Sequence, residues 1–599
     1  MKQTLRGSFE LMRLAYRLDR RRLLVALALM LLQSSALPLA APALAAVTDA
    51  AVDHDTGGAS LAAVLVAAMV IASLTAGHFA HIFYFELGDL AVMRLERELI
   101  DLSNASPGIE HHERPDYADK IQVLRTELAR SGWGSMQALL SSVGLGLAIV
   151  ITGVLLAGLN PWLLTLPVAA VPPLLLGRRA EAAVADARER AALDNRRARH
   201  LFALATDAGP AKELRVCGLT EEVRSRHLHA WDSATDTLWR GEVRASVLRV
   251  AGQLAFALAY VGATLLVVRD AVAGRRSVGD VILVITLAAQ VNWQVTSAVT
   301  ILQQLQRTAR TMADLAWVRS VVRPRRGPTP GGGPTVPAPD EIRTGIAFEQ
   351  VAFTYPGTDR PVLEGVDLVL PAGSTVAVVG ENGAGKTTLV KLLCRFYDAT
   401  AGTVRVDGID LRDIDTAEWR TRIAAGFQDF SRFELLAREN VGVGNLPDIA
   451  SDTAVLAGLR RARAEGVLDR LDDGLDTQLG TTHTDGAQLS GGQWQKLALG
   501  RAMMREAPLL LVLDEPTSAL DAQAEHELFE QYALNARRVG GLTGAITLLV
   551  SHRFSTVRMA DLIVVVADGR VSESGSHDEL VALGGLYAEL FDLQAAAYR

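Results

Sequence analysis

The sequence predicts a two-part fold: a membrane α-helical domain of six spans, followed by an α/β domain with a mainly parallel sheet. Six stretches of about 20 apolar residues, the length that crosses a bilayer, occupy the first half of the chain. Short β-branched runs then alternate with helical stretches, which is typical of parallel α/β sheets. The chain has 599 residues, 49% of them hydrophobic, and a mean hydropathy of +0.21, which is high for a soluble protein.

The apolar stretches avoid Lys, Arg, Asp and Glu in their central parts, where a charge costs roughly 2.5–3.5 kcal/mol. Pro167, Pro172 and Pro173 shorten and break the fourth stretch, and the sixth is unusually polar. We expect residues 1–322 to form a transmembrane domain with long cytoplasmic loops. Its spans lie near residues 23–46, 59–85, 133–157, 162–177, 247–268 and 281–302.

Loop charges orient these spans, because Lys and Arg accumulate on the cytoplasmic side. The N-terminal leader and the loops at 86–130 and 178–244 are rich in arginine, whereas the segment between the first two spans has aspartates but no Lys or Arg. Three arginines between spans five and six favour the opposite orientation. The balance places the leader, the long loops and the C-terminal half in the cytoplasm, and the protein in the cytoplasmic membrane.

The first apolar stretch also resembles a secretory signal peptide, because it has a basic flank and an A-x-A ending. A retained span is favoured because the charged region before the apolar core is longer than signals usually have. Cleavage near Val47 is the alternative.

Residues 323–342 form the expected linker, because Pro and Gly are too dense there for a helix or a strand to continue. Residues 343–599 form the expected α/β domain. Near its start, "VVGENGAGKTTLVKLL" follows an apolar strand and opens a helix with the spacing G-x-x-x-x-G-K-[ST]. Such a P-loop curls backbone N–H groups around phosphate oxygens, so this is a P-loop nucleotide-binding domain. The expected contact residues are Gly380, Glu381, Asn382, Gly383, Ala384, Gly385, Lys386, Thr387 and Thr388.

Acidic residues end another apolar strand, "LLLVLDEP". Asp514 suits a Mg²⁺ ligand together with the Thr387 hydroxyl, and Glu515 suits a base that polarises the attacking water. His552, after "ITLLV", is placed to touch the γ-phosphate. The "LSGGQ" run just ahead of a helical stretch provides a second phosphate-binding helix start. Because the P-loop already holds one nucleotide, this second cradle belongs to the nucleotide of another subunit.

Other site classes find little support in the sequence. Net charge is −7 and no long basic run appears, so no nucleic-acid surface is predicted. Cys217 and Cys394 are the two cysteines and lie far apart, which argues against a disulfide framework or a zinc cluster. His78 and His81 stand three apart on one helix face, where a metal site is the alternative to packing.

With these motifs the chain resembles an ATP-binding cassette (ABC) exporter half-transporter, six spans fused to one nucleotide-binding domain. "LSGGQ" matches the family signature, with Ser490, Gly491, Gly492 and Gln493 at the nucleotide. The resemblance further implies that Gln428 is the Q-loop residue, Asp521 in "SALD" the D-loop residue, His552 the H-loop residue and Tyr355 the aromatic that stacks on adenine. It implies ATP and Mg²⁺ as ligands, with Glu515, His552 and Gln428 in catalysis and Thr387, Gln428 and Asp514 at the metal.

The resemblance also implies a working cycle. Two chains, a homodimer or alternatively a heterodimer, would sandwich two ATP molecules and switch the membrane cavity from inward- to outward-facing. The segments 107–121 and 209–219 are the expected levers, docking near Gln428, with a solvated charged surface as the alternative. Exporters usually carry an acidic-glycine stretch before the signature, whereas "GTTHTDGAQ" stands here, so no coupling residue is assigned in it.

Cargo contacts are expected along a polar stripe in span six, with a weaker partner face in span five. Such amides, hydroxyls and aromatics suit an amphipathic drug, lipid or hydrophobic peptide, and interhelical hydrogen bonding is the alternative role. An ATP-gated channel or sensor, an importer and a soluble ABC ATPase are the rival functions. The stripe residues are Thr286, Gln290, Trp293, Ser297 and Thr300 in span six, and Gln253, Phe256 and Tyr260 in span five.

Overall fold

The computed structural model describes residues 2–322, 336–515, 540–541, 543–551 and 553–597. It divides into two compact units. The first contains Met1–Leu102 and Asp119–Ser320, and the second contains Ser103–Ala118 and Val321–Arg599. The short segment Ser103–Ala118, which we call the coupling segment, therefore groups with the C-terminal unit although it lies between two long helices of the first.

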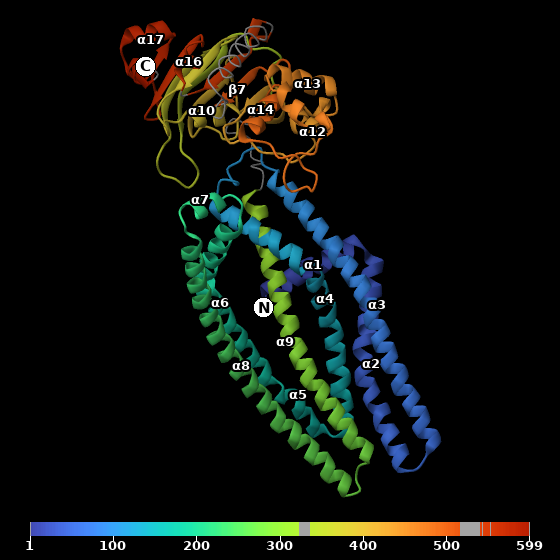
Figure 1. The fold of residues 1–599 in the computed structure, drawn as a ribbon. Coiled ribbons are helices and arrows are strands. Elements are labelled where there is room, and N and C mark those ends of the chain that lie inside the picture. The colour runs from blue at the N-terminus through green and yellow to red at the C-terminus, as the bar shows by residue number, and fades with distance from the viewer. Residues whose placement is uncertain (1, 323–335, 516–539, 542, 552, 598–599) are drawn as a thin grey trace. The chain divides into compact units, whose positions relative to one another are not determined.

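Long helices build the first unit (Figure 1). Six helical stretches are long and apolar enough to cross a membrane, which confirms the predicted fold class for this half. The described helices are α1 (Lys2–Leu18), α2 (Arg20–Val52), α3 (Thr56–Ser103), α4 (Pro115–Leu159), η1 (Pro161–Leu164), α5 (Thr165–Ala169), α6 (Val171–Thr206), α7 (Ala211–Val216), α8 (Thr220–Val272) and α9 (Val278–Val321).

Prolines interrupt the fourth apolar stretch, as predicted. It consists of η1, α5 and α6 in succession, and the chain reaches Pro172 and Pro173 in the first turn of α6. Proline is tolerated there because the first-turn N–H groups have no intrahelical acceptor. The Asn160 side chain caps η1 by accepting a hydrogen bond from the Trp162 N–H at 3.0 Å.

The charged leader forms a helix of its own, α1, which the sequence analysis did not predict. Its Leu11 and Ala15 are buried in a core shared with α2, α3 and α4. On another side, a Cβ at Gly7 would come within 2.7 Å of the Ala309 Cα, so α1 also lies close against α9. Asp19 separates α1 from α2 and caps α2 by accepting from the Arg21 and Arg22 N–H groups.

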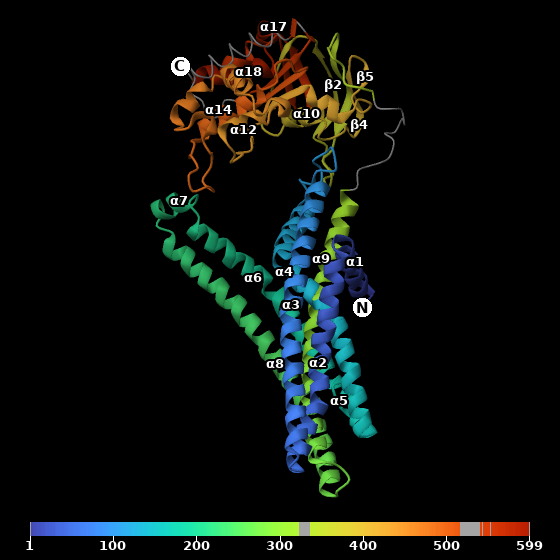
Figure 2. The same cartoon turned by 90° about the vertical axis from the view of Figure 1, so that its right-hand side faces the viewer.

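Helices α6 and α8 run side by side along most of their length in both views (Figures 1 and 2). Small residues allow this approach, since a Cβ at Gly252 would lie 2.8 Å from the Pro173 Cα. An ion pair between Arg249 and Glu181, 2.9 Å apart, joins the same two helices. At the end of the bundle near the α2–α3 turn, Asp49 of α2 accepts from the Gly279 N–H at 2.6 Å and fixes the start of α9.

Two sheets form the centre of the second unit. One is antiparallel, with strand order β2-β1-β4-β5, and the other has the order β10-β9-β3-β8-β7-β6, parallel except for β10 at its edge. The mainly parallel sheet of the prediction is thus present. The strands are β1 (Gly345–Phe353), β2 (Leu363–Pro371), β3 (Thr375–Val379), β4 (Ala401–Val406), β5 (Ile409–Asp410), β6 (Ile423–Gly426), β7 (Leu510–Asp514), β8 (Ile546–Val550), β9 (Leu562–Ala567) and β10 (Arg570–Gly575).

Helices and short helical turns cover both faces of the mainly parallel, six-stranded sheet. The α-helices are α10 (Lys386–Leu393), α11 (Thr416–Thr421), α12 (Ala437–Gly442), α13 (Asp452–Arg461), α14 (Gly491–Ala502), α16 (Phe554–Val557), α17 (His577–Leu583) and α18 (Leu586–Ala597). The 3-10 turns are η2 (Leu446–Asp448), η3 (Glu465–Arg470) and η4 (Gly474–Asp476). Strands β7 and β8 are buried at every position, which explains their continuous apolar sequences.

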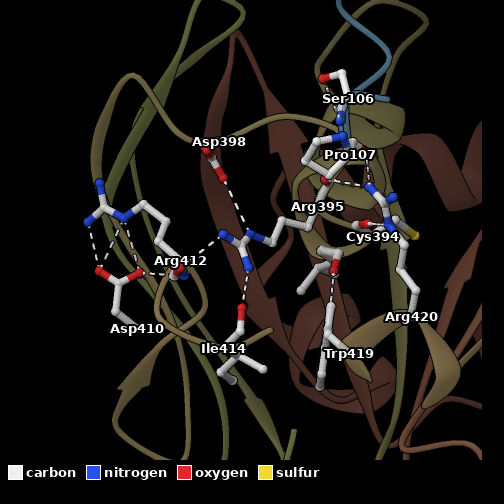
Figure 3. A network of polar contacts seen from close by, with 12 residues as sticks. Ser106, Pro107, Cys394, Arg395, Asp398, Asp410, Arg412, Ile414, Trp419 and Arg420 are labelled. Carbon is white, nitrogen blue, oxygen red and sulfur yellow. Dashed lines mark hydrogen bonds and ion pairs between the residues drawn. The ribbon is translucent and has the colours of Figure 1, made fainter. Parts of the chain in front are cut away.

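Trp419 of α11 is the largest fully buried side chain among the described residues, and its indole N–H donates to the Leu393 carbonyl at 2.8 Å (Figure 3). Trp419→Ala should leave a cavity and cost about 3–5 kcal/mol, which lowers the thermal midpoint of the domain by about 6–20 °C. Trp419→Phe, which keeps a ring but loses the hydrogen bond, should have the smaller effect. Equal midpoints for the Ala variant and the wild type would contradict this packing.

Candidate nucleotide-binding site

The glycine loop lies between β3 and α10 and needs glycine for two reasons. Gly380 and Gly385 have positive φ angles of 149° and 109°, which side chains disfavour. A Cβ at Gly385 would also lie 2.6 Å from Leu363 Cδ2, and one at Gly380 would overlap the Val566 carbonyl. The backbone therefore makes its tight turn at the carboxyl end of a buried parallel strand and directs the start of α10 toward that end.

Lys386 begins α10 and is buried. Its ammonium donates to the carbonyls of Gly380 and Glu381 at 2.9 and 2.8 Å, so it folds back over the loop. Burial lowers the pKa of Lys386, although Glu515 and Asp514 oppose this effect. Because the two carbonyl partners are neutral, phosphate oxygens at the same place would form stronger, charge-assisted hydrogen bonds.

Asp514 is buried at the end of β7, and the Thr387 hydroxyl of α10 donates to it. Burial raises the pKa of Asp514, and the nearby Glu515 adds to the rise. A bound cation would offset both effects. A carboxylate and a hydroxyl brought together in this way are the oxygen ligands that Mg²⁺ prefers, so Thr387 and Asp514 fit the predicted metal site.

Glu515 and Gln428 lie together because they follow two neighbouring parallel strands, β7 and β6. The Gln428 amide donates to a Glu515 carboxylate oxygen at 2.9 Å. Glu515 itself has a φ of +47°, and a left-handed conformation at a residue with a side chain costs about 1–3 kcal/mol. Two of the three predicted catalytic residues, Glu515 and Gln428, thus lie together next to Asp514.

Tyr355 lies beside the glycine loop, because its hydroxyl is 3.1 Å from the Thr388 hydroxyl in the first turn of α10. Its ring packs edge-on against Phe353 and Tyr397, with centroids 4.9 and 5.4 Å apart. An aromatic ring held in this way suits stacking on a base.

The signature residues cap α14. The Ser490 hydroxyl accepts from the Gln493 N–H at 3.3 Å, and the Gln493 side chain accepts from the Ser490 N–H at 2.8 Å. Ser490 and Gly491 are exposed. Within the described parts of the chain, this turn makes no hydrogen bond to the glycine loop. His552 and Asp521 lie outside the described residues.

The coupling segment contacts α10, α11 and the turn between α10 and β4. The Ile109 N–H donates to the Phe396 carbonyl at 3.3 Å, and Arg420 of α11 donates to the Pro107 carbonyl at 2.5 Å (Figure 3). The sequence predicts docking near Gln428. The ring of Phe427, the neighbour of Gln428 in the sequence, lies 5.9 Å from that of Phe396.

Arg420 was missed by the sequence analysis. It also donates to the Arg395 and Cys394 carbonyls, so it joins the coupling segment to the end of α10 (Figure 3). No motif distinguishes this arginine from the many others of the chain. The second predicted lever, residues 209–219, contains the short helix α7, whose Val216 is 88% exposed.

The residues of the polar stripe in span six differ in their burial. The Gln290 amide donates to the Leu37 carbonyl of α2 at 3.0 Å and is buried, which favours the interhelical alternative for this residue. Gln294, which was not predicted, is buried and donates to Thr152 of α4 at 2.9 Å. Trp293, in contrast, is 61% exposed. The larger set divides as follows: Gln253 and Thr300 are exposed, Thr286, Ser297 and Tyr260 are half-buried, and Phe256 is buried.

The two histidines of span two do not gather further ligands. His81 Nδ1 lies 2.6 Å from the Tyr84 hydroxyl, and the ring packs edge-on against Tyr84. Across the part of the chain that the structure describes, no group of three or more His, Cys, Asp or Glu side chains could hold a metal ion.

Comparison with known proteins shows that residues 363–518 match the family model described as ABC transporter. The ATP-dependent lipid A-core flippase of Cupriavidus pinatubonensis is 44% identical over 42% of this chain and 41% of its own length. The mitochondrial potassium channel ATP-binding subunit of Pongo abelii is 45% identical over 44% of this chain and 35% of its own. The alignments thus span less than half of these curated relatives.

A solved structure extends the likeness to both units. The structure of a bacterial Atm1-family ABC exporter with ATP bound has a TM-score of 0.73 and 25% identity to this chain. The alignment covers 96% of this chain and 98% of that one. The six apolar helices and the α/β domain therefore occur together in one known architecture.

Proposed function

We propose that this chain, an ABC half-transporter of six spans and one nucleotide-binding domain, uses ATP to export an amphipathic solute across the cytoplasmic membrane. The proposal depends on one observation: Lys386, Asp514 and Glu515 lie close together at one edge of the parallel sheet. The same chain has six helices that are apolar enough to cross a membrane. The nucleotide-binding domain lies in the cytoplasm, where ATP is.

ATP hydrolysis in this site divides among the residues described. The loop 380–388 cradles the phosphates, Lys386 moves from its carbonyl partners to the phosphate oxygens, and Glu515 orients and polarises the attacking water. Thr387, Asp514 and Gln428 would hold Mg²⁺, which neutralises phosphate charge. The Gln428 amide donates to one Glu515 oxygen and thereby helps to orient the carboxylate toward the attacking water.

A second copy of the chain completes each site. Gly491 and Gly492 in the first turn of α14 supply N–H groups, and the exposed Ser490 can donate its hydroxyl hydrogen, to the nucleotide bound to the partner's loop. We propose a homodimer, with a heterodimer as the alternative.

A lipid-like amphipathic molecule is the proposed cargo, because several relatives are named lipid A-core flippases. An ATP-gated channel or sensor is the second candidate, since another relative is named a mitochondrial potassium channel ATP-binding subunit. A transport assay with an ion-current control separates the two functions.

Trp293→Ala should change which amphipathic compounds stimulate ATP hydrolysis, because this exposed ring is available to cargo whereas Gln290 is engaged with α2. Basal hydrolysis should stay unchanged. Trp162→Ala, which removes a ring of similar exposure in η1, is the matched control. The cargo role of Trp293 is refuted if both variants keep the stimulation profile of the wild type.

Arg420→Met should uncouple cargo from hydrolysis, because it removes the hydrogen bond to Pro107 in the coupling segment. Hydrogen bonds of charged groups contribute about 1.5–3 kcal/mol, so the docking weakens while the glycine loop stays intact. We expect ATP binding and basal turnover to persist and cargo stimulation to fall. Arg405→Met, which breaks an ion pair with Glu349 in the antiparallel sheet, is the control. Full stimulation in the Arg420 variant contradicts this role.

A further inference from the structure

Lys391 in the last turn of α10 joins two parts of the second unit that the proposed mechanism has not connected. Its ammonium lies 2.6 Å from a Glu113 carboxylate oxygen of the coupling segment. The other Glu113 oxygen accepts from the Tyr397 hydroxyl. Lys391 is largely covered, with a side-chain exposure of 23%, whereas the Glu113 side chain is 39% exposed.

The same ammonium faces the aromatic cluster around Tyr355. Lys391 Nζ lies 5.1 Å from the Tyr355 ring centroid and 5.7 Å from that of Tyr397, within the range of a cation–π interaction. Phe353 packs edge-on against Tyr355, and the Tyr355 hydroxyl reaches Thr388. The Tyr355 ring is therefore held by Lys391, by its aromatic neighbours and by the first turn of α10.

Charge keeps this arrangement in place near neutral pH. Burial raises the pKa of Glu113, but hydrogen bonds from Lys391 and Tyr397 outweigh it, so that the pKa lies below its usual value. Burial also raises the pKa of Tyr397, and its bond to Glu113 adds to the rise. Glu113 is thus a carboxylate and Tyr397 a neutral phenol that can donate to it.

We propose that Glu113 and Lys391 are positioning residues that set the Tyr355 ring for the base of ATP and thereby link the base to the coupling segment. The inference rests on the proposed binding of ATP. It adds that the coupling segment is linked to the adenine base of the nucleotide through Tyr355. Lys386, Asp514 and Glu515, in contrast, act at the phosphates.

Base binding and movement of the coupling segment should affect each other. When the base stacks on Tyr355, the ring is fixed, and the Lys391 and Glu113 side chains lose alternative positions. Because coupling free energies are reciprocal, anything that displaces Glu113 weakens binding of the base to the same extent. Movement of the coupling segment is thus expected to change ATP affinity without any change at the phosphates.

The test compares ATP with inorganic tripolyphosphate, which has the phosphates but no base, using the full-length chain in lipid nanodiscs. Lys391→Met should weaken ATP binding by about 2- to 30-fold, the range expected when a cation–π interaction is lost, and leave tripolyphosphate binding unchanged. Glu113→Gln should weaken ATP binding in the wild-type background but not in the Lys391→Met background. Lys391→Arg should retain wild-type affinity, and Arg405→Met is the control for loss of an unrelated ion pair.

Hydrogen exchange of the backbone at 107–113 provides the second readout. ATP should slow this exchange more than tripolyphosphate does, and the difference should disappear in Lys391→Met. The proposal is overturned if tripolyphosphate binding falls together with ATP binding, if Glu113→Gln leaves ATP affinity unchanged, or if the two ligands protect the segment equally. Unaltered ATP binding by Lys386→Ala would instead refute the proposed function, which keeps the two failures distinct.

Discussion

Glu515→Gln is expected to bind ATP and to lose turnover by about 10²–10⁴-fold, the usual contribution of a general base. The amide keeps the size of the side chain and its place beside Gln428, but it cannot accept a proton from water. Phosphate release measures turnover, and displacement of a fluorescent ATP analogue measures binding. Because the nucleotide is not consumed, the dimer should stay closed around it.

Two further variants make this prediction specific. Lys386→Ala should weaken ATP binding itself, because the buried ammonium is the cation that we propose contacts the phosphates. Glu364→Gln, an exposed carboxylate paired with Arg570 on the edge of the domain, should behave as the wild type. Near-normal turnover in Glu515→Gln would remove Glu515 from its role.

Mixing chains that carry Ser490→Arg with chains that carry Lys386→Ala is expected to restore activity that neither variant has alone. In a mixed dimer both defects fall on one shared site, and the other site combines an intact loop with an intact signature. Random mixing makes half of the dimers mixed, so independent sites should give about a quarter of wild-type hydrolysis. Crosslinking of differently tagged chains verifies that mixed dimers form.

The control for this experiment places both substitutions in one chain and mixes it with the wild type. Each mixed dimer then has one defect on each site, and the contribution of mixed dimers should vanish. If verified mixed dimers of the first kind are inactive, the shared-site geometry is wrong or the two sites act only together.

Local patterns account for most of what the sequence predicted correctly. The glycine loop needs positive φ angles at Gly380 and Gly385, which few residues other than glycine adopt, so the motif dictates its own geometry. Strand ends are a second such pattern: Asp514 ends β7 and Gln428 follows β6, and the parallel pairing of these strands brings both residues to one sheet edge. Proline sites in the fourth span also revealed the break in advance.

Long-range pairs account for what was missed. Glu113 and Lys391 are 278 residues apart, and each taken alone resembles an ordinary surface charge. The periodicity of span six placed Gln290 and Trp293 on one face, yet the neighbouring helix α2 covers only Gln290. Such differences depend on which helices pack together, and the hydrophobic pattern of a single helix does not contain that information.

Lipid movement in proteoliposomes tests the central claim most directly. The chain is reconstituted with its nucleotide-binding domain outside, together with a fluorescent short-chain phospholipid and a matched set of drugs and hydrophobic peptides. The account predicts that ATP, but not a non-hydrolysable analogue, moves at least one amphipathic compound away from the leaflet or compartment that faces ATP, and that Glu515→Gln abolishes this movement. Sustained ATP hydrolysis that moves no compound, or that opens an ion conductance instead, would contradict export.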